Sequence, residues 1–172
     1  ALAESRRGNS GFVLAEDAQE ISVESARAKF EDVIEALSMA GVDVSNIHFD
    51  EGYGYRLNGE DGSTDDFGRF ERIAYGKGGK PLLGSYNHDA GQITIYRNAF
   101  SSRIFRYRIA PGQIGWERLN AQPGFQSGLF VTAHEIGHRV HGHNWQSNRN
   151  EFQANTYARR LYDNVCRGNP RC

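Results

Sequence analysis

Apolar residues recur at three- and four-residue spacing in three segments of the chain, and shorter apolar runs lie between these segments. The first segment, residues 22–40, places Phe30, Ile34 and Leu37 on one face and is followed by Gly41. This spacing is typical of an amphipathic helix that ends at a glycine. We therefore predict an N-terminal helix over residues 22–40.

Between residues 42 and 98 the apolar runs are short and are bounded by Gly, Asn or Asp. They lie at residues 47–49, 53–57, 72–75 and 92–96. Runs of this length and composition are typical of β-strands joined by tight turns. We predict a small antiparallel or mixed sheet, with residues 87–91 forming the turn into its last strand.

Helical periodicity returns in residues 126–141 and again in residues 150–165. In the first of these segments, four apolar residues fall within about 60° of one another around a helix axis. They are Leu129, Ala133, Ile136 and Val140. The first twenty residues are polar without periodicity, so we predict a loose arm there. The expected organisation is one α+β domain with an arm (1–20), a helix and sheet (21–124), and two helices with a tail (125–172).

Composition excludes two broad classes of protein. Lys and Arg number 20 and Asp and Glu number 21, so the chain lacks the basic excess of a nucleic-acid-binding protein. No stretch approaches the roughly 18 consecutive apolar residues that a membrane span needs. We expect neither a nucleic-acid partner nor a membrane-spanning segment.

Two further segments leave alternatives open. The acidic residues 58–66 could supply oxygen ligands to Ca²⁺, but no bidentate Glu follows at the EF-hand spacing, which favours a solvated turn. Residues 97–108 interleave Arg with Phe and Tyr. That pattern is typical of a surface helix or strand with a basic edge, and the alternative is a groove for a peptide or a polyanion.

The strongest chemical signal lies in the predicted helix 126–141, where His134, Glu135 and His138 form an HExxH motif. On an α-helix the two histidines lie about 40° apart and one turn along, so both imidazoles can bind one metal ion. Glu135 is offset by about 100° more, where it can act as general base on a metal-bound water without being a ligand. We predict Zn²⁺ as the cofactor.

Two histidines leave a catalytic zinc site one protein ligand short. His141 lies on the correct face but about 10 Å along the helix from His134, so we interpret it as a neighbour of the ligands or a substrate-facing group, and His143 as incidental. Glu151 lies near the apolar stripe of the second helix, where a carboxylate must be paired or bind a metal. The alternative is an ordinary first-turn Glu behind an Asn150 N-cap. We predict Glu151 as the third ligand.

Other residues are candidates for supporting roles. Asn155, one turn after Glu151, could accept the second N–H of a ligand histidine and so fix its tautomer. An oxyanion formed during hydrolysis also needs a hydrogen-bond donor. Tyr157, His141 and Tyr96 are the candidates for that donor, and the sequence does not choose among them.

The runs HEIGH, EFQAN and TYARRL resemble the gluzincin metallopeptidases, in which a helical HExxH motif is completed by Glu from an ExxA(D/N) helix. The block from His134 to Leu161 is similar to the short form in ImmA/IrrE-type proteins, and HtpX-like peptidases share the second motif with Asp where Asn155 stands here. After Leu161 the chain departs from the Leu-Leu-Met-Pro ending of the ImmA/IrrE group. The resemblance implies a zincin-like fold and an edge strand, here Gln92–Tyr96, along which a protein or peptide substrate lies extended.

These observations predict a zinc-dependent endopeptidase that hydrolyses peptide bonds with Glu135 as general base. Two alternatives stay open. One is a toxin-like or effector protease with a narrow target, and the other is a zinc-binding sensor or interaction module with little proteolytic activity. The presence of Glu135 favours an enzyme, because a purely structural site gains nothing from a carboxylate there.

Cys166 and Cys172 are the two cysteines of the chain, and they are close enough in sequence to form a small disulfide ring. The alternative is a pair of free thiols on the tail, which would be prone to oxidation. The first residues, Ala1-Leu2-Ala3, resemble the small-x-small end of a secretory signal. We therefore predict a disulfide and a secreted or periplasmic location.

Overall fold

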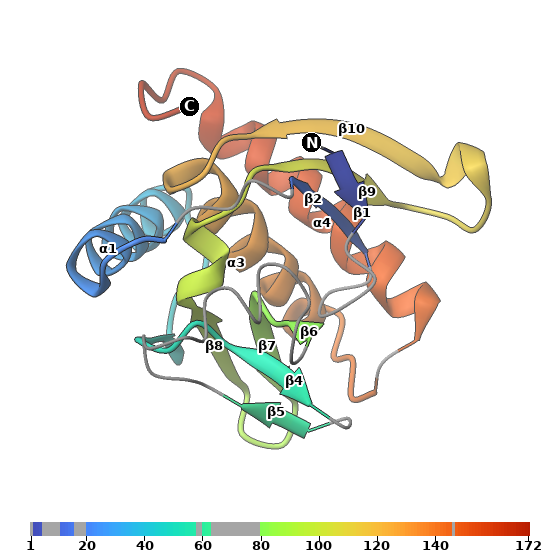
Figure 1. Ribbon diagram of the computed structural model, residues 1–172, viewed down its shortest axis with the longest axis horizontal. Helices are drawn as coiled ribbons and strands as arrows, with labels where there is room; N and C mark the ends of the chain where they lie inside the picture. Colours follow the sequence, from blue (N-terminus) through green and yellow to red (C-terminus); the bar gives the residue numbers. More distant parts are fainter. Residues whose placement is uncertain (1, 5–10, 16–19, 58–59, 63–79, 146) are drawn as a thin grey trace.

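The computed structural model describes residues 2–4, 11–15, 20–57, 60–62, 80–145 and 147–172. Its architecture is α+β, as predicted. Helix α3 (Phe125–Val140) lies at the centre, with α1 (Val23–Met39) packed on one side and α4 (Asn148–Cys166) on the other (Figure 1). Three small sheets lie around these helices, so α3 is covered over most of its length.

The three helices lie within two residues of their predicted bounds. At the start of α1, the Ser22 side chain accepts a hydrogen bond from the Ser25 N–H (3.1 Å). The start of α4 differs from the alternative interpretation of Glu151, in which Asn150 was the N-cap. Instead Ser147 is the cap, because its hydroxyl accepts the Asn150 N–H at 3.1 Å, and the helix therefore begins at Asn148.

A three-stranded sheet packs against α3, in the strand order β3-β8-β7. Its strands are β3 (Ile47–Asp50), β7 (Gly84–Asn87) and β8 (Gln92–Tyr96). The sheet is mixed, because β3 pairs with β8 in parallel and β7 pairs with β8 antiparallel. The prediction that Gln92–Tyr96 is an edge strand is wrong, since β8 has a hydrogen-bonded neighbour on each side. The outer strand beside α3 is β7.

A second sheet of four antiparallel strands has the order β1-β2-β9-β10. Its strands are β1 (Leu2–Glu4), β2 (Phe12–Ala15), β9 (Ile104–Arg108) and β10 (Trp116–Ala121). The prediction of a loose arm over residues 1–20 is therefore wrong where the arm is described. The apolar run 11–15 forms β2, and Phe12 is fully buried.

The segment 97–108, for which two interpretations were open, forms the short 3₁₀ helix η1 (Arg97–Phe100) and then strand β9. Strand β9 is internal to its sheet, and Ile104 and Tyr107 on it are buried. Strands β9 and β10 form a long hairpin, and the short 3₁₀ helix η2 (Gln113–Gly115) lies near the tip of the hairpin (Figure 1). The segment thus combines a short helix with an internal strand whose Ile104 and Tyr107 face the core while Arg106 is exposed.

A third antiparallel sheet consists of β4 (Tyr55–Leu57), β5 (Glu60–Gly62) and β6 (Lys80–Pro81). Asp61, a candidate ligand in the acidic segment, lies in β5. The other candidates there, Ser63 and Asp65, and the strand predicted at residues 72–75 lie outside the described residues. The calcium alternative for this segment is therefore untested.

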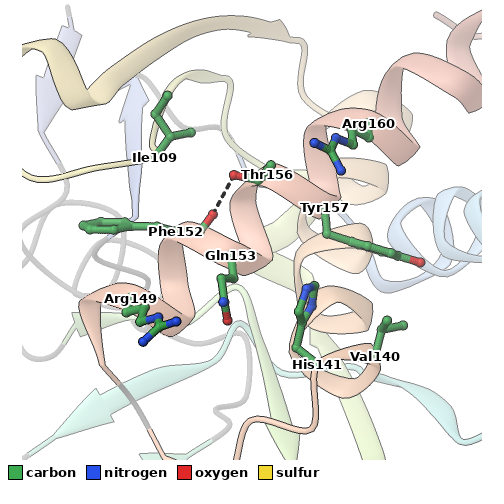
Figure 2. A pocket seen from close by; sticks show the side chains of 9 residues that line it. All are labelled: Ile109, Val140, His141, Arg149, Phe152, Gln153, Thr156, Tyr157 and Arg160. Atoms are coloured by element: carbon green, nitrogen blue, oxygen red, sulfur yellow. Dashed lines mark hydrogen bonds between the residues drawn. The ribbon is translucent and has the colours of Figure 1, made fainter.

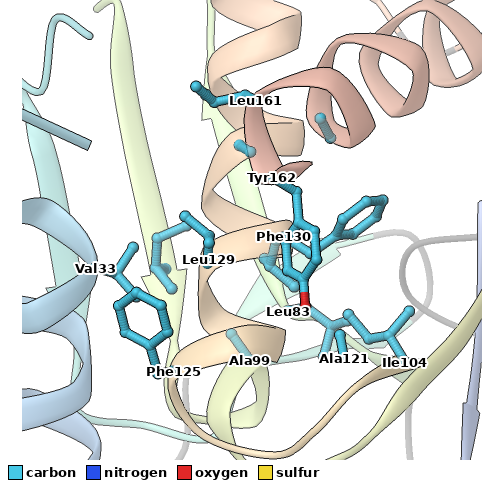
Figure 3. Close-up of a cluster of buried hydrophobic side chains, with 14 of the residues drawn as sticks. Val33, Leu83, Ala99, Ile104, Ala121, Phe125, Leu129, Phe130, Leu161 and Tyr162 are labelled. Atoms are coloured by element: carbon cyan, nitrogen blue, oxygen red, sulfur yellow. The ribbon is translucent and has the colours of Figure 1, made fainter. Parts of the chain in front are cut away.

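One hydrophobic cluster joins α1, α3 and α4 to the strands around them (Figure 3). Its fully buried members include Leu37, Ile95, Leu129 and Phe130. The predicted stripe of α3 faces this core at Leu129, Ala133 and Ile136, whereas Val140 is 60% exposed. The core thus fixes the rotation of α3 about its axis, and with it the direction of the two histidines.

The C-terminal tail is fixed to the rest of the molecule. Cys166 and Cys172 form the predicted disulfide. Arg171 makes ion pairs with Asp32 (3.6 Å) and Glu35 (3.9 Å) of α1. Within the part of the chain that the structure describes, no helix is long and apolar enough to cross a membrane.

Candidate metal centre

His134, His138 and Glu151 meet where α3 and α4 pack together. The Glu151 Oε2 atom lies 2.9 Å from the Nε2 atom of each histidine, and the two Nε2 atoms are 3.1 Å apart. All three side chains are buried. The three residues are therefore brought together as the spacing predicts, and they form a cluster that could hold a metal ion.

A glycine allows the two helices to approach closely enough for this contact. A Cβ atom on Gly137 would lie 3.0 Å from both the Cα atom and the carbonyl oxygen of Ala154. Glycine at this position therefore lets the backbone of α4 lie against α3. The carboxylate of Glu151, one turn before Ala154, can then reach the histidines.

Asn155 fixes the tautomer of His134. Its Nδ2 group donates to the backbone carbonyls of Arg108 (2.7 Å) and Gly11 (3.4 Å), so its Oδ1 atom must face the histidine. That oxygen lies 2.8 Å from His134 Nδ1, which therefore carries the proton. In the neutral imidazole this leaves the Nε2 lone pair directed at the cluster, as metal binding requires.

A second chain of hydrogen bonds fixes His138, and His143 is part of it. The Oε1 atom of Gln153 lies 2.8 Å from His143 Nε2, so that nitrogen is the donor. His143 Nδ1 then accepts a hydrogen bond from the N–H of His138 Nδ1, 2.9 Å away, and His138 Nε2 carries the lone pair. Burial lowers the pKa of His143, which favours the neutral acceptor. The interpretation of His143 as incidental is therefore wrong.

Glu151 completes the cluster with a negative charge. Burial by itself raises the pKa of Glu151, but the positive charge and the Nε2–H groups that His134 and His138 present when protonated lower it by more. The net effect is a pKa well below the usual carboxyl range, so the group is ionised at neutral pH. The prediction that Glu151 faces inward rather than being an ordinary first-turn residue is consistent with its burial.

The donor set fits a zinc-type site. Two neutral imidazole nitrogens and one carboxylate oxygen are the ligands found in one class of catalytic zinc sites. With metal–ligand bonds of about 2.0–2.1 Å, tetrahedral ligand atoms lie about 3.3 Å apart. The observed separations of 2.9–3.1 Å are within a few tenths of an ångström of that value.

Glu135 follows His134 on α3 and lies under strand β7. Its side chain is 2% exposed. A Cβ atom on Gly84 of β7 would lie 3.0 Å from Glu135 Cγ and 3.2 Å from Glu135 Oε2. Strand β7, the outer strand of the β3-β8-β7 sheet, therefore covers the Glu135 carboxylate. It does so at Gly84, which has no side chain.

Two residues of the N-terminal segment, Phe12 and Gly11, also contact residues of the site. The sequence analysis missed both. The ring of Phe12 packs edge-on against the His134 imidazole, with centroids 4.9 Å apart. The carbonyl of Gly11 accepts a hydrogen bond from Asn155. The signal that could have identified them is the apolar run 11–15, which stands out within an otherwise polar segment.

The three candidate oxyanion donors, His141, Tyr157 and Tyr96, lie in two different places. His141 donates from Nδ1 to the Gly137 carbonyl (2.8 Å), and its ring lies edge-on to that of Tyr157. Both residues line a pocket to which none of the cluster residues contributes (Figure 2). Tyr96 is buried at the end of β8, where its N–H donates to the Leu83 carbonyl. We assign the oxyanion role to none of them.

Searches of protein-family models, of curated proteins and of solved structures find no match to the chain.

Proposed function

We propose that the chain is a zinc-dependent endopeptidase. The observation that carries the proposal is the buried triangle of His134, His138 and Glu151, whose histidine lone pairs are directed inward, together with the buried Glu135 carboxylate on the same helix as the two histidines. A structural metal site would need no such carboxylate. The HExxH spacing and the ExxAN motif of the second helix support the same assignment, as does the resemblance of these motifs to gluzincin peptidases.

The roles of the residues follow from their chemistry. Zinc bound by the three ligands supplies a Lewis acid that lowers the pKa of a water molecule and polarises the scissile carbonyl. Glu135 accepts the proton of the attacking water and delivers it to the leaving amine. Asn155 and His143 hold the ligand imidazoles in the required tautomers. Phe12 covers His134 and limits access of water from that side.

We place the substrate along β7 rather than along Gln92–Tyr96. Strand β7 is the outer strand of its sheet, and it passes over Glu135 at Gly84. No strand in the described part of the chain pairs with the outer side of β7, and an extended protein or peptide segment can add to such a strand through main-chain hydrogen bonds. Its scissile bond would then lie near Glu135.

We propose a secreted or periplasmic location. The Cys166–Cys172 disulfide supports it, because disulfides persist mainly in oxidising compartments. The ring also fixes the tail against α1, which gives the bond a structural use.

Metal analysis and a cleavage assay test the proposal together. The purified protein should contain zinc and should cleave casein or a quenched peptide library, and a chelator should abolish the cleavage. Glu135→Gln should keep the metal and the fold but lose turnover by several orders of magnitude. Glu31→Gln, an exposed residue of α1, is the matched control and should cleave at the wild-type rate.

The outcomes separate the three functions considered. Cleavage of one protein in a target-cell lysate, without cleavage of casein, would indicate a narrow-target protease. Zinc binding without cleavage of any substrate would indicate a sensor or interaction module. If Glu135→Gln cleaves as fast as the wild type, the general-base assignment is wrong.

A further inference from the structure

A second pocket lies on the outer face of α4, away from the metal ligands. It has a volume of about 450 Å³ and is bounded by α4, by the end of α3 and by Ile109 of the β9–β10 hairpin (Figure 2). This volume lies within the range of ligand-binding pockets. None of His134, His138 and Glu151 lines it. The proposed peptidase function leaves this pocket without a role.

Two arginines mark the ends of the pocket. Arg149 and Arg160 are eleven residues apart on α4, which places them within about 20° of one another around the helix and about 16 Å apart along it. Both are exposed. Neither makes an ion pair within the part of the chain that the structure describes, and no Asp or Glu lines the pocket. The positive charge of both groups is thus available to a ligand.

Gln153 and Thr156 lie on α4 between the arginines, and aromatic and aliphatic side chains flank them on both sides. Phe152 extends from α4 toward Ile109, and Tyr157 and Val140 lie on the opposite side (Figure 2). Val140 is 60% exposed although it belongs to the apolar stripe of α3. A ligand that fits this surface carries an apolar group between two negative charges.

We propose that this pocket binds an extended acidic peptide segment, with two carboxylates four residues apart and an apolar or aromatic side chain midway between them. Alternate side chains of an extended chain point to the same side, and the chain rises about 3.3 Å per residue, so carboxylates four residues apart face the pocket together about 13 Å apart. The long arginine side chains can lean inward from backbone positions roughly 16 Å apart to meet them. A single phosphate or carboxylate cannot reach both ends. Two isolated cations around an apolar centre also suit a peptide better than the continuous charge of a nucleic acid.

The pocket shares one residue with the metal centre. Gln153 lines the pocket and also accepts the hydrogen bond of His143. Substitution of Gln153 would therefore change both sites at once. The test leaves this residue unchanged and measures binding instead of cleavage, so that its result does not depend on the peptidase proposal.

Fluorescence anisotropy with a labelled peptide tests the proposal. The probe is Glu-Ala-Phe-Ala-Glu, in which both Glu and the Phe share one side of an extended chain, measured with the Glu135→Gln protein so that no turnover occurs, both with zinc and with a chelator. We expect saturable binding that weakens with salt. Arg149→Glu and Arg160→Glu should each weaken binding at least about tenfold, and Phe152→Ala should weaken it by a similar factor. Arg167→Glu, an exposed arginine outside the pocket, should change binding less than twofold.

Several results would overturn the proposal. The first is that the peptide shows no saturable binding to the unchanged pocket. The second is that the double variant Arg149→Glu/Arg160→Glu binds the peptide as tightly as the unchanged pocket does. The third is that a peptide with Lys in place of both Glu residues binds as tightly as the acidic peptide. Tighter binding of a single-stranded oligonucleotide at the same residues would assign the pocket to nucleic acid instead. Thermal unfolding and zinc affinity of each variant identify losses caused by misfolding, and Phe152→Leu provides a conservative variant. Peptide binding by a protein that cleaves nothing would leave this proposal intact while removing the peptidase function.

Discussion

Asn155 and His134 are 21 residues apart in the chain, yet the Oδ1 atom of the amide lies 2.8 Å from the Nδ1 atom of the imidazole. The amide cannot turn over, because its Nδ2 group is held by the carbonyls of Arg108 and Gly11. One side chain thus connects α4, β9 and the N-terminal segment to the proposed metal ligand.

We expect Asn155→Ala to weaken zinc binding about 10- to 100-fold, because the His134 ring loses the acceptor that fixes its tautomer and orientation. The variant should also be less stable, since the Arg108 carbonyl loses the Asn155 donor and the His134 N–H loses its acceptor. Zinc affinity can be measured by competition with a chelating dye. Asn164→Ala, at an exposed position of the same helix, is the control, and equal affinities of the two variants would contradict the role of Asn155.

His143 should matter in a similar way although it does not face the cluster. We expect His143→Ala to lower zinc affinity about tenfold or more, because His138 Nδ1 loses its acceptor and the Nε2 tautomer is no longer enforced. His143→Asn, which keeps an acceptor, should recover part of the loss. His141→Ala removes the ring that stacks on His143 and should have a smaller effect. Wild-type zinc affinity in His143→Ala would show that the contact is dispensable.

Local patterns in the sequence predicted the helices and the three cluster residues. Helical periodicity fixes which side of α3 faces the core, and the HExxH spacing depends on that geometry alone. Glu151 was predicted because a carboxylate near an apolar stripe needs a partner. These inferences need only neighbouring residues on one helix, together with the expectation that the two helices pack.

The contacts between distant segments could not be predicted in this way. The position of β8 inside its sheet depends on the parallel pairing with β3, some 45 residues earlier, which leaves no trace in either strand. The role of His143 depends on Gln153, which reaches it from another helix. Strand β2 was missed because its apolar run is short and lies among polar residues, so averaging over the arm concealed it.

Gly84 should be intolerant of a side chain because of Glu135. An added methyl group would lie 3.0–3.2 Å from Glu135 and from Val131 Cγ1, so the carboxylate or the strand must shift by a few tenths of an ångström. We expect Gly84→Ala to lower kcat about tenfold or more while zinc affinity changes less than threefold. Single-turnover cleavage and dye competition measure the two effects. An unchanged kcat would show that the position of Glu135 under β7 is not critical.

Removal of the metal should destabilise the protein, because the ligands belong to two different helices. A metal that binds only the folded chain contributes about 4 kcal/mol when its free concentration is a thousand times Kd. We therefore expect a chelator to lower the unfolding midpoint of the wild type. The unfolding midpoint of His138→Ala, which lacks one ligand, should not decrease when chelator is added. A wild-type midpoint that is independent of zinc would argue against a folded-state metal site.

Alkaline pH should destabilise the protein through Tyr107. Burial, and then the hydrogen bond and charge of Glu117, raise the pKa of Tyr107 above its usual value of 10.0. Above about pH 10 the unfolded chain loses this proton while the folded chain keeps it, so the unfolded state binds fewer protons and stability falls as the pH rises. Burial raises the pKa of Tyr162 and Tyr157 as well, and these groups act in the same direction.

Tyr107→Phe separates the contribution of this residue from the others. The variant loses the hydrogen bond to Glu117, so near pH 8 it should be less stable than the wild type by about 1 kcal/mol. Because phenylalanine does not titrate, this difference should shrink as the pH approaches 11. Urea unfolding across this range measures it, with Tyr86→Phe, which removes a surface hydroxyl near His88, as the control. A difference that stays constant with pH would mean that Tyr107 has the same pKa in the folded and unfolded chains, contrary to its burial beside a carboxylate.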